Sequence, residues 1–473
     1  MNNRPNHRHG DEPTRGTRSS SSASSSAEPR AELELRAPPA RFLDYEKSLA
    51  CIHCGLCLSS CPTYLETGDE NDSPRGRIYL MRAVQDGRLA LGDTAVTHID
   101  RCLGCRACEA VCPSGVQYGN LLEHTRDHVE KNFERGAFQN FLRRVAIEKV
   151  FPNQALMKMA LLPARVTNWL GAESLLPKFA REALSLVPDD VQAGDLPEIS
   201  PSPCRRRREE SSYGTAITST PHVVAYNRVG FIRGCVMDVM FGPTNLNSVR
   251  LLNAAGYDVV TPPSQACCGA LHAHNGNLAE ARLAAQANIL AFEKLELDAI
   301  IINAAGCGST LKEYGHLLAD DPAWAERGKK FSAKVKDLTE FLVANWPDLE
   351  SKIQNPKSKI QVTYHDACHL AHAQRITQPP RVLVKAVAGK NFVELPESDL
   401  CCGSAGTYNL TEPEMAERLQ HRKTENILRT KADLVVTSNP GCLLQIRAGL
   451  KKAGSPARVM HIADYLAEAL GVS

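Results

Sequence analysis

Two cysteine motifs of identical spacing, C-x2-C-x2-C-x3-C-P, lie near the start of this chain of 473 residues. In dicluster iron-sulfur domains, the first three thiolates of such a motif bind one [4Fe-4S] cluster, and the fourth thiolate binds the other cluster. The spacing therefore predicts two [4Fe-4S] clusters with crossed ligand sets. The predicted sets are Cys51, Cys54, Cys57 and Cys112 for one cluster, and Cys61, Cys102, Cys105 and Cys108 for the other.

Disulfide bonds and zinc are the alternatives for these cysteines. Disulfides are typical of small secreted domains, and nothing in this chain resembles a signal peptide. A zinc ribbon would use pairs of C-x2-C, not triplets followed by Cys-Pro. Seventeen cysteines without an export signal indicate a reducing compartment. We predict a ferredoxin-type domain in a cytoplasmic protein, with a peripheral position on the inner face of the cell membrane as the alternative.

Charge and hydropathy limit the partners. The chain has 55 Lys and Arg against 53 Asp and Glu, a net charge of +2, which gives no general reason to expect nucleic acid. No segment approaches the roughly 18 to 20 consecutive apolar residues of a spanning helix. We therefore expect a soluble or peripheral protein without a nucleic-acid partner.

Composition divides the chain into six parts. Residues 1–38 are rich in Ser and Arg and poor in large apolar side chains, which predicts a disordered tail, with a transit peptide as the alternative. The amphipathic helices expected after residue 125 either pack one domain onto the next or lie on a membrane surface. The remaining predicted parts are a ferredoxin-type domain (39–125), a helical connector (126–190), a linker or insertion with Cys204 (191–225), and two repeats (226–350 and 358–473).

The second half of the chain repeats itself. Cys235 recurs as Cys368, the Cys-Cys-Gly triplet at 267–269 recurs at 401–403, and Cys307 recurs as Cys442. A short apolar run precedes each cysteine landmark, and helical patterns at 278–297 and 412–428 follow two of them. The expected strands are 229–232, 257–260, 299–302, 360–364, 392–395 and 434–437. Alternating strands and helices predict an α/β domain with a parallel sheet for each repeat.

Each predicted sheet collects four thiols at the carboxyl ends of its strands, where ligands gather in such folds. The two sets are Cys235, Cys267, Cys268 and Cys307 in the first repeat, and Cys368, Cys401, Cys402 and Cys442 in the second. Four thiolates can hold a further [4Fe-4S] cluster or a zinc ion. Ordinary buried cysteines without metal are the third interpretation.

The order of a mainly helical two-cluster ferredoxin domain, a helical connector and two Cys-Cys-Gly repeats resembles the family of glycolate oxidase iron-sulfur subunits from about residue 42 onward. Residues 364–372 (YHDACHLAH), 303–308 (NAAGCG) and 439–444 (NPGCLL) carry the likeness. Similar layouts occur in iron-sulfur subunits of anaerobic glycerol-3-phosphate dehydrogenase and lactate oxidation systems, and in heterodisulfide reductase. Ala304 and Asn439 replace the first cysteine of the C-x2-C that ends the broader pattern, so a five-thiolate cluster is not expected.

The resemblance implies an oxidoreductase acting on CH-OH donors, in which this chain serves electron transport. FAD would belong to partner glycolate oxidase subunits, and a quinone or another membrane acceptor would take the electrons. This chain has no G-x-G-x-x-G phosphate cradle, and we assign it no catalytic residue. The alternatives are a glycerol-3-phosphate or lactate oxidation complex, or disulfide reduction at the repeats.

For each of two groups of polar and charged side chains, the sequence is consistent with two different roles. Arg75 and Arg77, between the cysteine motifs, either stabilise a reduced cluster or simply begin a helix. Four residues beside Cys368 either handle protons or cap the following helix. They are His365, Asp366, His369 and His372.

Overall fold

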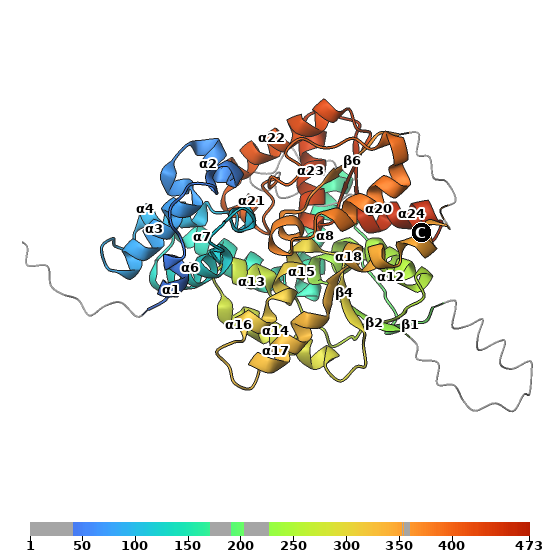
Figure 1. The fold of residues 1–473 in the computed structure, drawn as a ribbon, viewed down its shortest axis with the longest axis horizontal. Helices are drawn as coiled ribbons and strands as arrows, with labels where there is room; N and C mark the ends of the chain where they lie inside the picture. The colour runs from blue at the N-terminus through green and yellow to red at the C-terminus, as the bar shows by residue number, and fades with distance from the viewer. Residues whose placement is uncertain (1–40, 171–190, 203–226, 352, 354–359) are drawn as a thin grey trace, which may run out of the picture. The chain divides into compact units, whose positions relative to one another are not determined.

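The computed structural model describes residues 41–170, 191–202, 227–351, 353 and 360–473 (Figure 1). The predicted tail and Cys204 lie outside these residues. Within the described ranges, no helix has both the length and the apolar character needed to cross a membrane.

The cysteine-motif region is helical, as predicted. Its longest helices bury one apolar face, with Ile78 and Met81 on one helix and Leu121 and Leu122 on another. Ser73 starts the first of these two helices, because its side chain accepts a hydrogen bond from Gly76 N at 3.0 Å. The elements are α1 (Tyr45–Leu49), η1 (Leu58–Ser60), α2 (Pro62–Thr67), η2 (Glu70–Asp72), α3 (Pro74–Gln85), α4 (Asp93–Asp100), α5 (Ala107–Ala110) and α6 (Tyr118–Asn132).

The connector continues as helix. It comprises α7 (Ala137–Phe141), the π-helical segment η3 (Leu142–Val150) and α8 (Gln154–Leu170). Met157 on α8 is buried in the same core as Met237 and Val239 of the first repeat, whereas Phe141 and Met159 are exposed. The buried methionine supports the packing interpretation for this part of α8 over the membrane-surface interpretation.

The first repeat contains a five-stranded sheet of order β1-β3-β2-β4-β5. All neighbouring strands are parallel except β1, which pairs antiparallel with β3. The elements are β1 (Ile199–Ser200), β2 (Arg228–Phe231), α11 (Cys235–Met240), α12 (Gly242–Ala254), β3 (Asp258–Val260), α13 (Ala270–His274), α14 (Leu278–Phe292), β4 (Ala299–Ile302), α15 (Ala305–Lys312), α16 (Tyr314–Leu317), α17 (Ala325–Lys334), β5 (Val335–Asp337), α18 (Leu338–Ala344) and α19 (Trp346–Glu350).

The second repeat contains a parallel sheet of order β6-β7-β8. The expected strand at 392–395 is reduced to a single bridge between Phe392 and Val362. Phe392 thus takes the place beside β6 that β3 takes beside β2. The elements are β6 (Val362–His365), η5 (His369–Ala373, π-helical), α20 (Gln378–Ala388), η6 (Gly389–Asn391), α21 (Tyr408–Thr411), α22 (Pro413–Thr430), β7 (Leu434–Thr437), α23 (Pro440–Lys452), β8 (Arg458–His461) and α24 (Ile462–Leu470).

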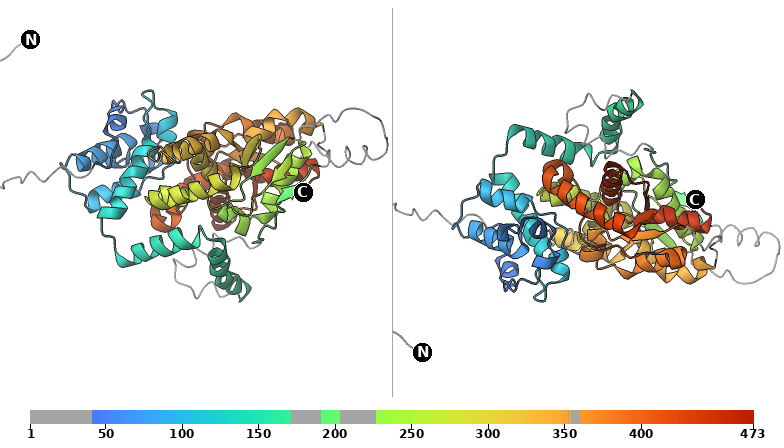
Figure 2. Two further views of the ribbon diagram at one scale, coloured as in Figure 1. Left: turned by 90° about the horizontal axis from the view of Figure 1, so that it is seen from below. Right: turned by 90° about the horizontal axis from the view of Figure 1, so that it is seen from above.

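Residues of the two repeats are buried together in shared hydrophobic clusters. Phe231 and Leu251 of the first repeat are buried in the same cluster as Tyr364 and Leu466 of the second. Helix α12 packs against α24, and α18 packs against α20. In Figure 2 the green-to-yellow first repeat lies beside the orange-to-red second repeat. Each contact joins the helix after the first parallel strand of one repeat to the helix after the last strand of the other. The sequence repeat is therefore also a repeat in three dimensions.

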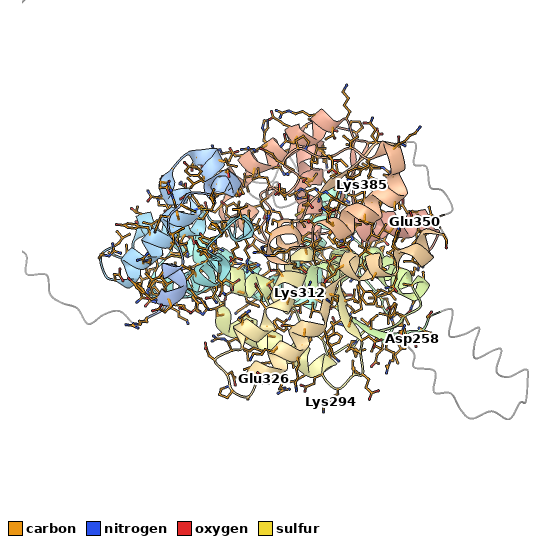
Figure 3. All side chains as sticks on the ribbon, viewed as in Figure 1. Asp258, Lys294, Lys312, Glu326, Glu350 and Lys385 are labelled. Carbon is orange, nitrogen blue, oxygen red and sulfur yellow. The ribbon has the colours of Figure 1, made fainter. Side chains whose placement is uncertain are left out.

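Part of the segment expected to be a linker is built into the first repeat. Residues 191–202 follow the edge of the sheet, and Ser200 on β1 pairs with Val259 on β3. Asp258, labelled in Figure 3, accepts a hydrogen bond from Ser202 N at 2.8 Å. Gly242 allows this segment to approach, because a Cβ there would lie 2.2 Å from Gly194 N.

Candidate metal centres

The first predicted ligand set lines one cavity near the protein surface. Cys51, Cys54, Cys57 and Cys112 all border this cavity, together with Cys108. Cys54 is exposed, and the other four are partly buried. Burial raises the pKa of Cys57 to about 11. A bound iron would instead favour its thiolate form, because the metal supplies the positive charge that the buried thiolate lacks.

The second predicted set lines a separate and deeper cavity. Its walls include the thiols of Cys61, Cys102, Cys105 and Cys108. Tyr118 OH donates to Cys102 Sγ at 3.5 Å, and Gly104 N donates to the same sulfur at 3.4 Å. Hydrogen bonds to thiolate sulfur stabilise the more negative, reduced state of a cluster.

The backbone between the cysteines has the shape of an anion site. His53 and Gly55 in the first motif have φ values of 55° and 86°, and Gly104 and Arg106 at the equivalent places in the second have 63° and 61°. Left-handed residues that alternate with right-handed ones turn successive N–H groups inward, an arrangement found around iron-sulfur clusters. His53 and Arg106 are the informative cases, since only glycine adopts this conformation freely.

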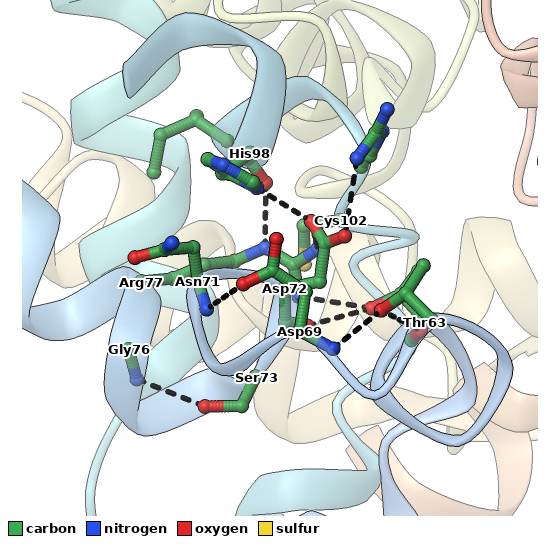
Figure 4. A network of polar contacts seen from close by, with 12 residues as sticks. Thr63, Asp69, Asn71, Asp72, Ser73, Gly76, Arg77, His98 and Cys102 are labelled. Atoms are coloured by element: carbon green, nitrogen blue, oxygen red, sulfur yellow. Dashed lines mark hydrogen bonds and ion pairs between the residues drawn. The ribbon is translucent and has the colours of Figure 1, made fainter. Parts of the chain in front are cut away.

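A buried ionic network adjoins the second cavity (Figure 4). Arg77 and Asp72 are both buried and form an ion pair of 3.3 Å, and His98 Nδ1 lies 2.8 Å from the same carboxyl oxygen. Arg77 Nη1 also donates to Thr63 Oγ1 at 3.0 Å and lies 3.9 Å from Cys61 Sγ. The guanidinium is thus held beside Cys61, a predicted ligand of one cluster, beyond what a helix start requires.

Arg75, two residues away on the same helix, has a different setting. It lines the first cavity, donates to His53 O at 3.1 Å and pairs with Glu70 at 2.6 Å. This ion pair is partly exposed, so solvent weakens its field.

The four predicted thiols of the first repeat meet at the carboxyl ends of its strands. Cys235 Sγ and Cys267 Sγ lie 3.5 Å apart. Hydrogen bonds from Cys235 and then Cys268 hold the pKa of Cys267 well below its usual range, and Cys268 in turn contacts Cys307. Gly269, with φ of 82°, lets the adjacent cysteines face one centre. The arrangement fits a metal bound by four sulfurs.

The second repeat gathers its own four thiols in the same way. Hydrogen bonds from Cys368 and then Cys402 lower the pKa of Cys401, and Cys402 contacts Cys442. Asn439 donates its amide to Cys442 Sγ at 3.6 Å, so the residue at the missing cysteine position contacts a predicted ligand.

The second repeat lies directly against the second cavity. Cys368 and Cys401 belong to the same buried cluster as Leu103 and Cys105 of the ferredoxin-type region. His369 Nε2 lies 3.0 Å from Gly104 O, between the cysteines of the second motif. No sequence signal predicted this contact, because it depends on how distant segments pack.

The helix-capping role considered for the residues beside Cys368 is wrong. No side chain caps η5. Asp366 instead accepts two hydrogen bonds of 2.6 Å from Arg381, and His372 Nε2 lies 2.9 Å from Asp399 O. Burial lowers the pKa of His369 to about 3, so this ring stays neutral near neutrality. His365 lies beside thiols, a position that sequence reasoning missed.

Comparison with known proteins agrees with this geometry. A family model described as "4Fe-4S dicluster domain" matches residues 47–116, and one described as "Cysteine-rich domain" matches residues 229–312 and 362–447. The probable glycolate oxidase iron-sulfur subunit of Bacillus subtilis (strain 168) is 41% identical over 437 residues, covering 91% of this chain and 95% of the relative. The glycolate oxidase iron-sulfur subunit of Escherichia coli (strain K12) is 35% identical over 437 residues, covering 91% and 96%.

A more distant relative covers only part of the chain. Lactate utilization protein A of Oceanobacillus iheyensis is 31% identical over 241 residues, which is 50% of this chain and 96% of that protein.

The helical dicluster region and the two cysteine-rich domains define an iron-sulfur electron-transfer subunit of an oxidoreductase. The chain belongs to the family of glycolate oxidase iron-sulfur subunits. The predicted fold class and family resemblance are both confirmed.

Proposed function

We propose that this subunit takes electrons from a flavin-containing partner that oxidises glycolate or a related 2-hydroxy acid, and delivers them to a quinone or another membrane acceptor. The names of the full-length relatives support glycolate as the donor. Clusters bound by the predicted cysteine sets would supply one-electron transfer, which links a two-electron flavin donor to one-electron steps.

The observation that carries this proposal is the contact between Cys105 and the thiols of the second repeat. Cys401 lies close enough to raise the pKa of Cys105, although burial of Cys105 contributes more. A bound metal at each thiol set would therefore lie near its neighbour, because Cys105, Cys368 and Cys401 belong to one buried cluster. The closeness of the cysteines of the ferredoxin-type region to those of the second repeat therefore supports a continuous electron path.

The surface around the first cavity supports entry or exit of electrons at the end of this path that is farther from the repeats. Ile52 and Leu56, which flank Cys54, are 67% and 58% exposed. Large apolar side chains beside an exposed ligand suit docking of a redox partner. We assign this loop to the flavin-containing partner, because the opposite end of the path lies within the repeats.

The test uses the native complex, purified without oxygen through a tag on this chain. Glycolate, D-lactate and sn-glycerol 3-phosphate are added separately, and flavin absorbance and the electron paramagnetic resonance (EPR) of reduced clusters are recorded. We expect glycolate to reduce both chromophores. In a Cys105→Ser variant, the flavin should still be reduced while cluster reduction falls at least tenfold. Reduction by sn-glycerol 3-phosphate alone, or a complex without flavin, would overturn the proposal.

A further inference from the structure

A buried imidazole lies next to two thiols of the second repeat. His365, the last residue of β6, has no exposed surface. Its donor atom and the sulfurs of Cys402 and Cys442 all lie within 4.8 Å of one another. Donor atoms that share one metal ion lie roughly 3.5 to 4 Å apart, given metal–ligand bonds of about 2.0 to 2.3 Å. The imidazole is therefore within reach of a metal centre that Cys402 and Cys442 bind.

The ring of His365 has no other evident task. Neither of its nitrogens reaches a hydrogen-bond partner among the described residues. Buried polar groups are almost always paired, so an unpaired ring calls for an explanation. The backbone carbonyl of Ser398 lies near the ring without forming a hydrogen bond to it. A neutral imidazole is the form that binds metals.

The position of His365 in strand β6 determines the direction of its side chain. Successive side chains of a strand point to opposite faces. Tyr364 is buried in one hydrophobic cluster, whereas Cys402 and Cys442 are buried in another. His365 follows Tyr364 and therefore faces the thiols.

The first repeat lacks this imidazole. Cys235 and Cys368 differ by 133 positions, so Ile232 corresponds to His365, and Ile232 is equally buried. Two sites with the same four thiols thus differ in one potential ligand. A requirement of the fold alone would not explain histidine, since isoleucine fills the equivalent place.

A second substitution adds charge at the same site. Gly269 packs on Ala281 and Gly403 packs on Ala416, which are 135 positions apart, so Asn288 corresponds to Lys423. Lys423 is buried and donates to Ser398 O at 3.4 Å. Burial lowers its pKa, and the thiolates of Cys402 and Cys401 oppose this change. A buried cation here favours an anionic centre in the second repeat.

We propose that His365 is a ligand of an iron-sulfur centre in the second repeat, beside the thiolates of Cys402 and Cys442. The proposal rests on the proposed function in taking iron as the metal. Where His365 binds iron in place of one of the four thiolates, the centre carries less negative charge and has a higher reduction potential, as in clusters with histidine ligands. The second-repeat centre is therefore reduced more easily than it would be with thiolate ligands alone, which suits the downstream end of the path.

The experiment measures nitrogen coupling to the iron centre in the full complex, purified without oxygen. Protein with natural or ¹⁵N-labelled histidine is studied by pulsed EPR, and the signal that disappears in Cys402→Ser is assigned to the second repeat. We expect histidine nitrogen coupling on this signal. His365→Cys should keep the iron and lose the coupling, while its reduced-to-oxidised ratio falls at least tenfold, about 59 mV for one electron. His365→Ala should lose iron from this site.

The control is His372→Asn, in the same repeat, where the ring already has a backbone partner. It should keep both iron and coupling. A second-repeat signal without histidine coupling, or zinc at this site, would overturn the inference while leaving substrate reduction of the other clusters, and hence the proposed function, intact. Conversely, if no substrate reduces any cluster but dithionite develops the coupled signal, the proposed function fails and the histidine ligand stands.

Discussion

Replacing Arg77 with methionine should make the second ferredoxin-type cluster harder to reduce. Arg77 is 1% exposed, and its guanidinium lies 3.9 Å from the sulfur of Cys61. Reduction adds negative charge to the cluster, and a buried cation stabilises that charge. Removing the cation therefore lowers the reduction potential.

The size of the shift follows from the charges. Two unit charges about 4 Å apart interact by ~4 kcal/mol at an effective dielectric constant of about 20. The added electron spreads over the cluster, and the paired carboxylate of Asp72 offsets part of the cation, so about 1 to 2 kcal/mol remains. Because ~1.4 kcal/mol corresponds to about 59 mV for one electron, we expect a decrease of roughly 40 to 85 mV.

The assay is a potentiometric titration followed by EPR, with the second cluster assigned by its loss in Cys105→Ser. Arg77→Lys keeps the charge and should restore most of the potential. Arg75→Met is the matched control on the same helix, and the first cluster should shift less there, because solvent screens the Arg75–Glu70 pair. An Arg77→Met protein with full iron content and an unchanged second potential would refute the reasoning.

Two further predictions concern contacts around the ferredoxin-type region. Burial raises the pKa of Glu412 from 4.5 to about 7, and Asp100 adds to this effect. The proton on Glu412 therefore stabilises the folded state fully below pH 4.5, and this stability is lost as the pH rises through about 7. Hydrogen exchange at the start of α22 should increase over that range in the parent, and an equal increase in Glu412→Gln would contradict this assignment. Gly276→Ala would place a Cβ 2.5 Å from the Arg126 carbonyl and should speed proteolysis near α6, whereas Gly256→Ala, also at positive φ but with no atom within 4 Å, should not.

Much of this fold can be predicted from the sequence because its signals are local. The spacing within each cysteine motif and the strand–helix alternation of the repeats depend on short segments. The predicted strands 299–302 and 434–437 match β4 and β7. Strands β5 and β8 were missed because they are short and partly polar, with Lys336 in one and Arg458 in the other.

The contacts between distant segments could not be predicted. The approach of His369 to Gly104 depends on the packing of the second repeat, which leaves no periodic trace in the sequence. The position of His365 did leave a signal. An alignment of the two repeats sets His365 against Ile232, a polar residue against an apolar one at the end of equivalent strands. Such a mismatch between otherwise equivalent buried positions marks where duplicated sites have diverged.

The core shared by the two repeats has a consequence for how the protein can be taken apart. A chain cut between α19 and β6 would expose an apolar surface on each half, where Leu251 or Leu466 had been covered. Neither half should be soluble alone, but the two expressed together should reassemble. The repeats are thus two lobes of a single folding unit. One lobe can change its metal ligands while the other keeps the shared core covered.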